Sequence, residues 1–142
     1  MKAIALLPVA LLVAACSTVV PYAPTAQLSE NPRKIVERVL SEQPTLETPE
    51  FVRVNDDYFE YADGTVTEGS RWTRSQSTRT TTARVFYRSI ADLKLYEKRG
   101  VWYVVPESRQ GAEMTVVSVS NEADAKLFID ALASLRKQGS RE

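Results

Sequence analysis

The stretch between Thr80 and Val119 constrains the fold of this chain more than any other feature. It holds four runs rich in β-branched and aromatic residues, which are typical of strands, separated by turn-forming residues. The runs read TTARVFYR, LKLYE, VWYVV and MTVVSV. VWYVV is apolar on both faces, as in a strand at the centre of a sheet. Because short turns join the last three runs, we expect them to be antiparallel neighbours.

A helix is predicted directly after these strands. Asn121 suits its N-cap, Arg136 and Lys137 suit its last turn, and Gly139 suits its end. Its apolar side chains recur at helical spacing, at Ala125, Phe128, Leu132 and Leu135. This pattern predicts an amphipathic C-terminal helix that packs on the sheet.

A shorter helix and two further strands are predicted earlier in the chain. Asn31 and Pro32 suit an N-cap and a first helical position, and the apolar stripe that follows is Ile35, Val36, Val39 and Leu40. FVRVN and YFEYA alternate like strands, and Asp63-Gly64 predicts a hairpin turn. Residues 65–82 hold ten serines and threonines, so their pairing is not specified. We therefore expect an α+β domain with an antiparallel sheet of about six to seven strands, a short N-terminal helix and an amphipathic C-terminal helix.

The first residues have the layout of a cleaved export signal. Lys2 supplies a positive charge, an uncharged apolar run extends from Ala3 to Val13, and small residues precede Cys16. The sequence Val13-Ala14-Ala15-Cys16 resembles the lipobox of bacterial lipoproteins, in which lipid is attached to the cysteine and the preceding peptide is removed. The resemblance implies that residues 1–15 are a signal peptide and that Cys16 is the lipidation site. The alternative is an ordinary secretory signal that is cut after Ala15.

The lipoprotein resemblance implies a location and a domain organisation. Two or more acyl chains anchor a protein stably, so the chain would be held on a membrane through Cys16. Ser17, in place of an aspartate after the cysteine, favours the outer membrane, with the protein facing the periplasm. Pro21 and Pro24 disfavour helix, so residues 16–29 are predicted to be an extended tether. Residues 30–142 are then a single small domain. Its stability comes from its core, because Cys16 is the only cysteine and no disulfide can form within the chain.

The order of strands and helix resembles that of pleckstrin-homology-like domains. Bacterial members often contain a segment similar to VFYRSIADLKLYEKRGVWYVV, from Val85 to Val105, and the resemblance covers roughly residues 49–137. It implies a bent, barrel-like sheet that one helix plugs. Phosphoinositide-binding members carry basic residues at the first hairpin, whereas this chain has Asn55-Asp56-Asp57. The resemblance therefore implies a scaffold and no headgroup site.

The composition of the chain limits the catalytic and metal-binding chemistry that it can support. The chain has no histidine, so the commonest general base and metal ligand is missing, and lipid would occupy its only thiol. No motif for a cofactor or a metal is present, and none is predicted. Four carboxylates suggest a hydrolase as a less favoured function, in which they would form the active site: Asp56, Asp57, Glu60 and Asp63. Near-neutral charge and the expected location argue against nucleic acid as a partner.

Charge is unevenly distributed along the strands. Residues 47–63 hold six acidic side chains and one arginine, and residues 64–90 hold five arginines and one glutamate. The two segments either neutralise each other across strands or leave the arginines on an open face that binds an anionic partner. The candidate residues for such a face are Arg71, Arg74, Arg79, Arg84 and Arg88.

The leading functional hypothesis is a non-enzymatic interaction module of the cell envelope. Its partners would be the membrane, through the lipid on Cys16, and an envelope protein or an envelope polymer. The second hypothesis is a carrier of a small hydrophobic ligand. Its cavity would be lined by aromatic side chains drawn from Phe51, Tyr58, Tyr61, Trp72, Phe86 and Trp102.

Overall fold

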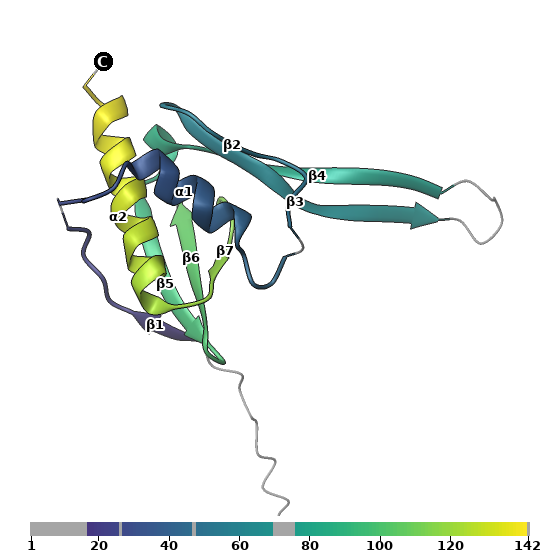
Figure 1. Ribbon diagram of the computed structural model, residues 1–142, viewed down its shortest axis with the longest axis horizontal. Coiled ribbons are helices and arrows are strands. Elements are labelled where there is room, and N and C mark those ends of the chain that lie inside the picture. Colours follow the sequence, from purple (N-terminus) through teal and green to yellow (C-terminus); the bar gives the residue numbers. More distant parts are fainter. Residues whose placement is uncertain (1–16, 26, 47, 70–75, 142) are drawn as a thin grey trace, which may run out of the picture.

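The computed structural model describes residues 17–25, 27–46, 48–69 and 76–141. The fold is α+β, as predicted, with two helices and two antiparallel sheets (Figure 1). The predicted lipidation site Cys16 and the candidate residues Arg71, Trp72 and Arg74 lie outside the described residues.

The first sheet has four strands in the order β1-β5-β6-β7. Their bounds are Thr18–Val20 for β1, Asp92–Lys98 for β5, Val101–Glu107 for β6 and Val117–Val119 for β7. Strand β6 carries the VWYVV run and pairs with β5 on one side and β7 on the other. The prediction of a central strand from its two apolar faces is therefore confirmed.

The second sheet has the order β2-β3-β4 and supplies the most prominent feature of the molecule. The bounds are Val52–Val54 for β2, Tyr58–Gly69 for β3 and Gln76–Phe86 for β4, which the 3₁₀ helix η1, Tyr87–Ser89, follows. Beyond the stretch that β2 covers, β3 and β4 continue as a two-stranded arm, residues 64–69 and 76–81, that projects from the body (Figure 1).

The hairpin turn predicted at Asp63-Gly64 is wrong. Strand β3 continues through both residues, and the pairing shifts there, from Ala62 opposite Thr82 to Gly64 opposite Thr81. Asp63 is thus the extra residue of a bulge, which bends a strand without ending it.

Both predicted helices are present with their predicted N-caps. Helix α1 spans Pro32–Ser41, and the Asn31 side chain accepts a hydrogen bond from the backbone N–H of Arg33 at 3.0 Å. Helix α2 spans Glu122–Gly139, and Asn121 accepts from the backbone N–H of Asp124 at 2.9 Å. These local signals lie within a few residues of each helix start, which is why the sequence alone identifies them.

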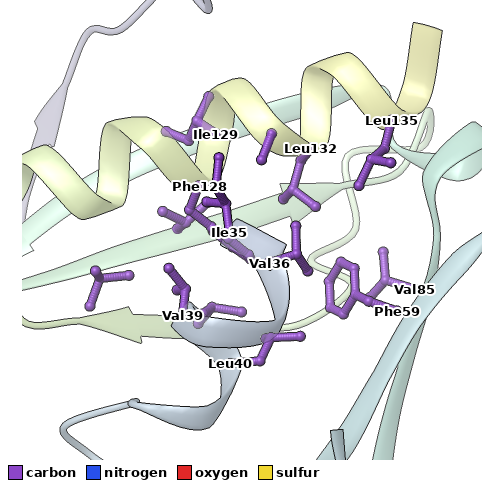
Figure 2. Packing of buried hydrophobic residues seen from close by; sticks show 14 of the residues in the cluster. Ile35, Val36, Val39, Leu40, Phe59, Val85, Phe128, Ile129, Leu132 and Leu135 are labelled. Carbon is purple, nitrogen blue, oxygen red and sulfur yellow. The ribbon is translucent and has the colours of Figure 1, made fainter. Parts of the chain in front are cut away.

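The core lies where the two helices meet both sheets. Figure 2 shows the apolar side chains of α1 packed against α2, with Phe59 and Val85 of the three-stranded sheet beside them. The Phe59 ring lies 6.4 Å from that of Phe128 and 6.1 Å from that of Tyr87, between ring centroids. Such aromatic contacts stabilise a core beyond the area they bury.

Two predictions of architecture need correction. The single, strongly bent sheet implied by the pleckstrin-homology resemblance is replaced by two separate sheets, because the chain leaves β4 through η1 and starts a new sheet at β5. Residues 18–25 are also no extended tether. Thr18, Val19 and Val20 pair with Glu97, Tyr96 and Leu95 of β5, so this part of the chain belongs to the folded domain.

Candidate functional site

The N-terminal segment is fixed to the C-terminal helix by one buried carboxylate. Asp130, in the middle of α2, is only 7% exposed. It accepts hydrogen bonds from the Tyr22 hydroxyl at 2.9 Å, the Thr25 backbone N–H at 2.9 Å and the Thr25 hydroxyl at 3.0 Å. Burial, together with the hydrogen bond and the charge of Asp130, raises the pKa of Tyr22. We call residues 17–25 the N-terminal strap.

A second buried carboxylate lies at the centre of the three-stranded sheet. Glu60 is 2% exposed, and its pairing neighbours across the sheet are Arg53 on β2 and Arg84 on β4. One carboxylate oxygen bonds the Arg53 guanidinium, and the other bonds Arg84 at 2.7 Å. The charges of the acidic and basic segments therefore neutralise each other at this position, as the cross-strand interpretation expects.

The five candidate arginines do not form one described surface. Arg84 is engaged by Glu60, and Arg79 lies in β4 opposite Val66. Arg88 lies in η1 and is exposed, but at the other end of β4 from the arm. Arg71 and Arg74 lie outside the described residues. Arg84 is therefore not available to an open face, because it is paired with Glu60. A face built from the other four arginines stays a prediction.

Arg88 instead joins a basic pocket at the C-terminal end of α2. The pocket has a volume of about 600 Å³, and its basic lining residues are Arg88, Arg109, Arg136, Lys137 and Arg141. The Arg136 guanidinium donates to the backbone carbonyls of Ile90 and Ala91, at 3.2 and 3.3 Å. Within the described residues, none of the five forms an ion pair with an acid. The helix dipole favours cations at a helix C-terminus, which accounts for the basic residues of α2. It does not account for Arg88 and Arg109, which come from outside the helix. With five basic side chains and no acidic partner in the described part, the pocket has the charge to hold an anion.

The carboxylates proposed for a hydrolase have separate roles. Glu60 is buried between its two arginines, Asp56 pairs with Arg33 at 2.7 Å, and Asp63 is the bulge residue of β3. The backbone carbonyl of Asp57 accepts from Tyr87 at 3.0 Å. In the described residues no three acidic side chains gather in a way that suits a metal ion.

Four of the aromatic residues proposed to line a ligand cavity make packing contacts: Tyr58, Tyr61, Phe86 and Trp102. Tyr61 is fully buried, and its hydroxyl lies 2.7 Å from that of Thr115. Tyr58 packs on Phe86 with ring centroids 5.3 Å apart, and Arg84 stacks on the Tyr58 ring at 5.0 Å. Trp102 is half-buried against the core. These contacts account for the four side chains without a ligand, whereas Phe51 is 36% exposed.

In the described part, no helix is long and apolar enough to cross a membrane. Comparison with family models, with curated proteins and with solved structures finds no match.

Sequence reasoning missed Asp130 and the full set of basic residues at the end of α2. Asp130 had a visible signal, because it is the only charged residue in the apolar run LFIDALASL, Leu127 to Leu135. A charged residue in such a run needs partners when it is buried. Arg88 and Arg109 carry no comparable signal, because only the tertiary fold brings them to the helix end.

Proposed function

We propose that this chain is a lipid-anchored interaction module of the bacterial cell envelope, held on the periplasmic face of the outer membrane through Cys16. Its domain binds an envelope protein, without catalysis, through the arm formed by β3 and β4. The absence of histidine and the commitment of the only cysteine to lipid support a role in binding.

The arm is the observation that carries the binding proposal. Pairing between β3 and β4 runs on from Gly64 opposite Thr81 to Gly69 opposite Gln76, past Tyr61, the last residue of β3 that pairs with β2. At about 3.4 Å per residue, the arm is roughly 17 Å long from Gly64 to Gly69. A two-stranded ribbon is marginally stable alone, so a partner is the natural source of the missing contacts.

The outer edge of the arm also suits a protein partner. Strand β4 is an edge strand of its sheet along its described length, so its outward backbone groups have no neighbouring strand. An extended segment of another protein can pair with such an edge. Thr81 and Thr82, where the arm joins the body, are exposed and accessible to such a segment.

Photo-crosslinking in intact cells tests the arm. A photoreactive amino acid at Thr82 should give one reproducible adduct, whereas the same amino acid at exposed Gln110, in the loop before β7, should not. Replacing residues 65–80 by the dipeptide Asn-Gly closes the hairpin at Gly64 opposite Thr81 and leaves Thr82 in place. That variant should lose the adduct. An adduct that survives the replacement, or identical adducts from Thr82 and Gln110, would refute an arm-dependent partner.

Anchoring is tested separately. Cys16→Ser should abolish incorporation of labelled fatty acid and leave the protein unprocessed or released from membranes. A Cys16→Ser protein that is still processed and membrane-bound would refute lipidation at this residue.

The basic pocket favours a second candidate, an anionic envelope polymer. Its five cations come from three parts of the chain and have no acid partner within the described residues. Carboxylate or phosphate groups suit such a pocket, because charge-assisted hydrogen bonds from arginine bind both.

A further inference from the structure

The way the N-terminal strap is bound fixes the position of the lipid relative to the domain. Thr18 pairs with Glu97, and the strap is bound again at Asp130, so its path is fixed from residue 18 onward. Cys16 is two residues before Thr18, and two residues span at most about 7 Å. If Cys16 carries lipid, as the proposed function holds, the bilayer surface lies directly beside the edge of the four-stranded sheet.

An apolar groove opens on the sheet face at this point. It has a volume of about 320 Å³ and contains Ser17, the residue bonded to Cys16. Its other lining residues are Tyr96, Tyr103, Val105 and Val116, together with two charged residues, Lys98 and Glu113. Val19, Tyr96 and Tyr103 pair in one row across β1, β5 and β6. We call this surface the anchor-side groove.

The groove lies on the face of the sheet that α2 leaves open. Leu95 and Val104, the next residues along β5 and β6, belong to the buried core, so Tyr96 and Tyr103 point to the opposite side. On this side Val19 is 57% and Val116 is 45% exposed. Exposed aliphatic side chains beside tyrosines are typical of surfaces that enter the headgroup region of a bilayer.

Basic residues border the groove next to the lipid. Lys98 lines the groove, and Arg99 follows it in the tight turn between β5 and β6. The backbone of Arg99 has φ 54° and that of Gly100 has φ 78°, and the Gly100 N–H donates to the Glu97 carboxylate at 2.7 Å. The turn is therefore well defined and presents two exposed cations beside the start of β1, which suits anionic lipid headgroups.

We infer that the anchor-side groove rests on the bilayer that carries the Cys16 lipid, with Val19, Tyr96, Tyr103 and Val116 at headgroup depth and Lys98 and Arg99 on lipid phosphates. The bilayer is the occupant because the chain enters it within two residues of the groove. The domain then has a fixed orientation on the membrane. The C-terminal end of α2, where the basic pocket lies, is at the opposite end of the body from β1 (Figure 1).

Site-specific labelling of the lipidated full-length protein tests this orientation. Because Cys16 is the only cysteine and lipid blocks its thiol, a cysteine introduced elsewhere is the single reactive thiol. Val116→Cys places a fluorophore in the groove, and Glu37→Cys, on the exposed side of α1, is the control. The protein is reconstituted in vesicles of phosphatidylethanolamine and phosphatidylglycerol that contain a headgroup nitroxide lipid.

The groove label should be quenched by the nitroxide at least about threefold more strongly than the control label, because it would sit in the headgroup layer. Lys98→Glu combined with Arg99→Glu should reduce this quenching in phosphatidylglycerol vesicles and leave it unchanged in vesicles of neutral lipid. Equal quenching of the two labels would overturn the inference.

Flotation of the same vesicles separates the two proposals. If the protein floats with the vesicles but the two labels are quenched equally, the lipid anchor is supported and the contact between the groove and the bilayer is refuted. Protein that does not float overturns both the anchor and the groove.

Discussion

Asp130→Ala should release the N-terminal strap without unfolding the rest of the domain. The substitution removes three hydrogen bonds, from the Tyr22 hydroxyl, the Thr25 N–H and the Thr25 hydroxyl. Hydrogen bonds to a charged acceptor contribute about 1.5–3 kcal/mol each. The conformational entropy that the released part of the strap regains offsets part of this loss, and the cost of burying the carboxylate disappears. We expect a net loss of about 2–4 kcal/mol.

Two measurements on the chain from Ser17 onward check this value. Chemical denaturation gives the loss in unfolding free energy, and hydrogen exchange should show faster exchange of the β1 amides, while α2 exchanges only as fast as the global loss requires. Asp130→Asn keeps the shape and one carbonyl oxygen, so it should lose about half as much. A change below about 0.5 kcal/mol for Asp130→Ala, with unchanged exchange in β1, would refute the role assigned to this carboxylate.

Tyr22 makes the stability of the fold decrease at alkaline pH. Its folded-state pKa is raised, so its hydroxyl stabilises the fold at every pH below the ordinary tyrosine value of about 10. This contribution is lost as the pH rises through the folded-state pKa. In Tyr22→Phe the alkaline loss that depends on this residue should vanish, and an unchanged alkaline profile would contradict the assignment.

Four further substitutions test individual contacts by denaturation or by titration with a ligand. Tyr61→Phe should lower the free energy of unfolding by about 1 kcal/mol, because it removes the hydrogen bond to Thr115. Tyr87→Phe should leave the free energy of unfolding unchanged or raise it, because the buried Tyr87 hydroxyl has no hydrogen-bond partner in the described part. Equal losses in the two variants would contradict this reasoning. Glu60→Gln should cost about 1–2 kcal/mol, since it leaves its arginines without a counter-charge, and thermal unfolding will show whether it does. Arg88→Gln should weaken pyrophosphate binding to the basic pocket about fivefold, or about 1 kcal/mol, in low-salt calorimetry, and exposed Lys34→Gln should not.

The parts of the fold that sequence predicts are those with local signals. Both helices begin at the predicted N-caps, Asn31 and Asn121, because capping involves residues two or three positions apart. The central position of β6 followed from its two apolar faces. In the same way, the pairing of Glu60 with Arg84 matched one of the two charge interpretations, although only the register could decide between them.

The parts that sequence did not predict depend on distant contacts. The strap has two prolines and a strand of three residues, so nothing local marks it as ordered. Its order comes from β5 and from Asp130, and the Thr25 to Asp130 bonds join residues 105 positions apart. The arm was missed for a related reason. Serine and threonine give a weak strand pattern, and Asp63-Gly64, read as a turn, is a bulge within a continuous strand.

The bond between the strap and α2 also has a consequence for the order of folding. The strap lies near the start of the chain, whereas Asp130 lies near its end, 105 positions after Thr25. In a chain that emerges from its N-terminus, the strap therefore cannot bind Asp130 until α2 has emerged and folded. If the chain is exported and lipidated as proposed, the strap would close on Asp130 only after Cys16 had been exposed to the enzymes that attach lipid and cut the signal.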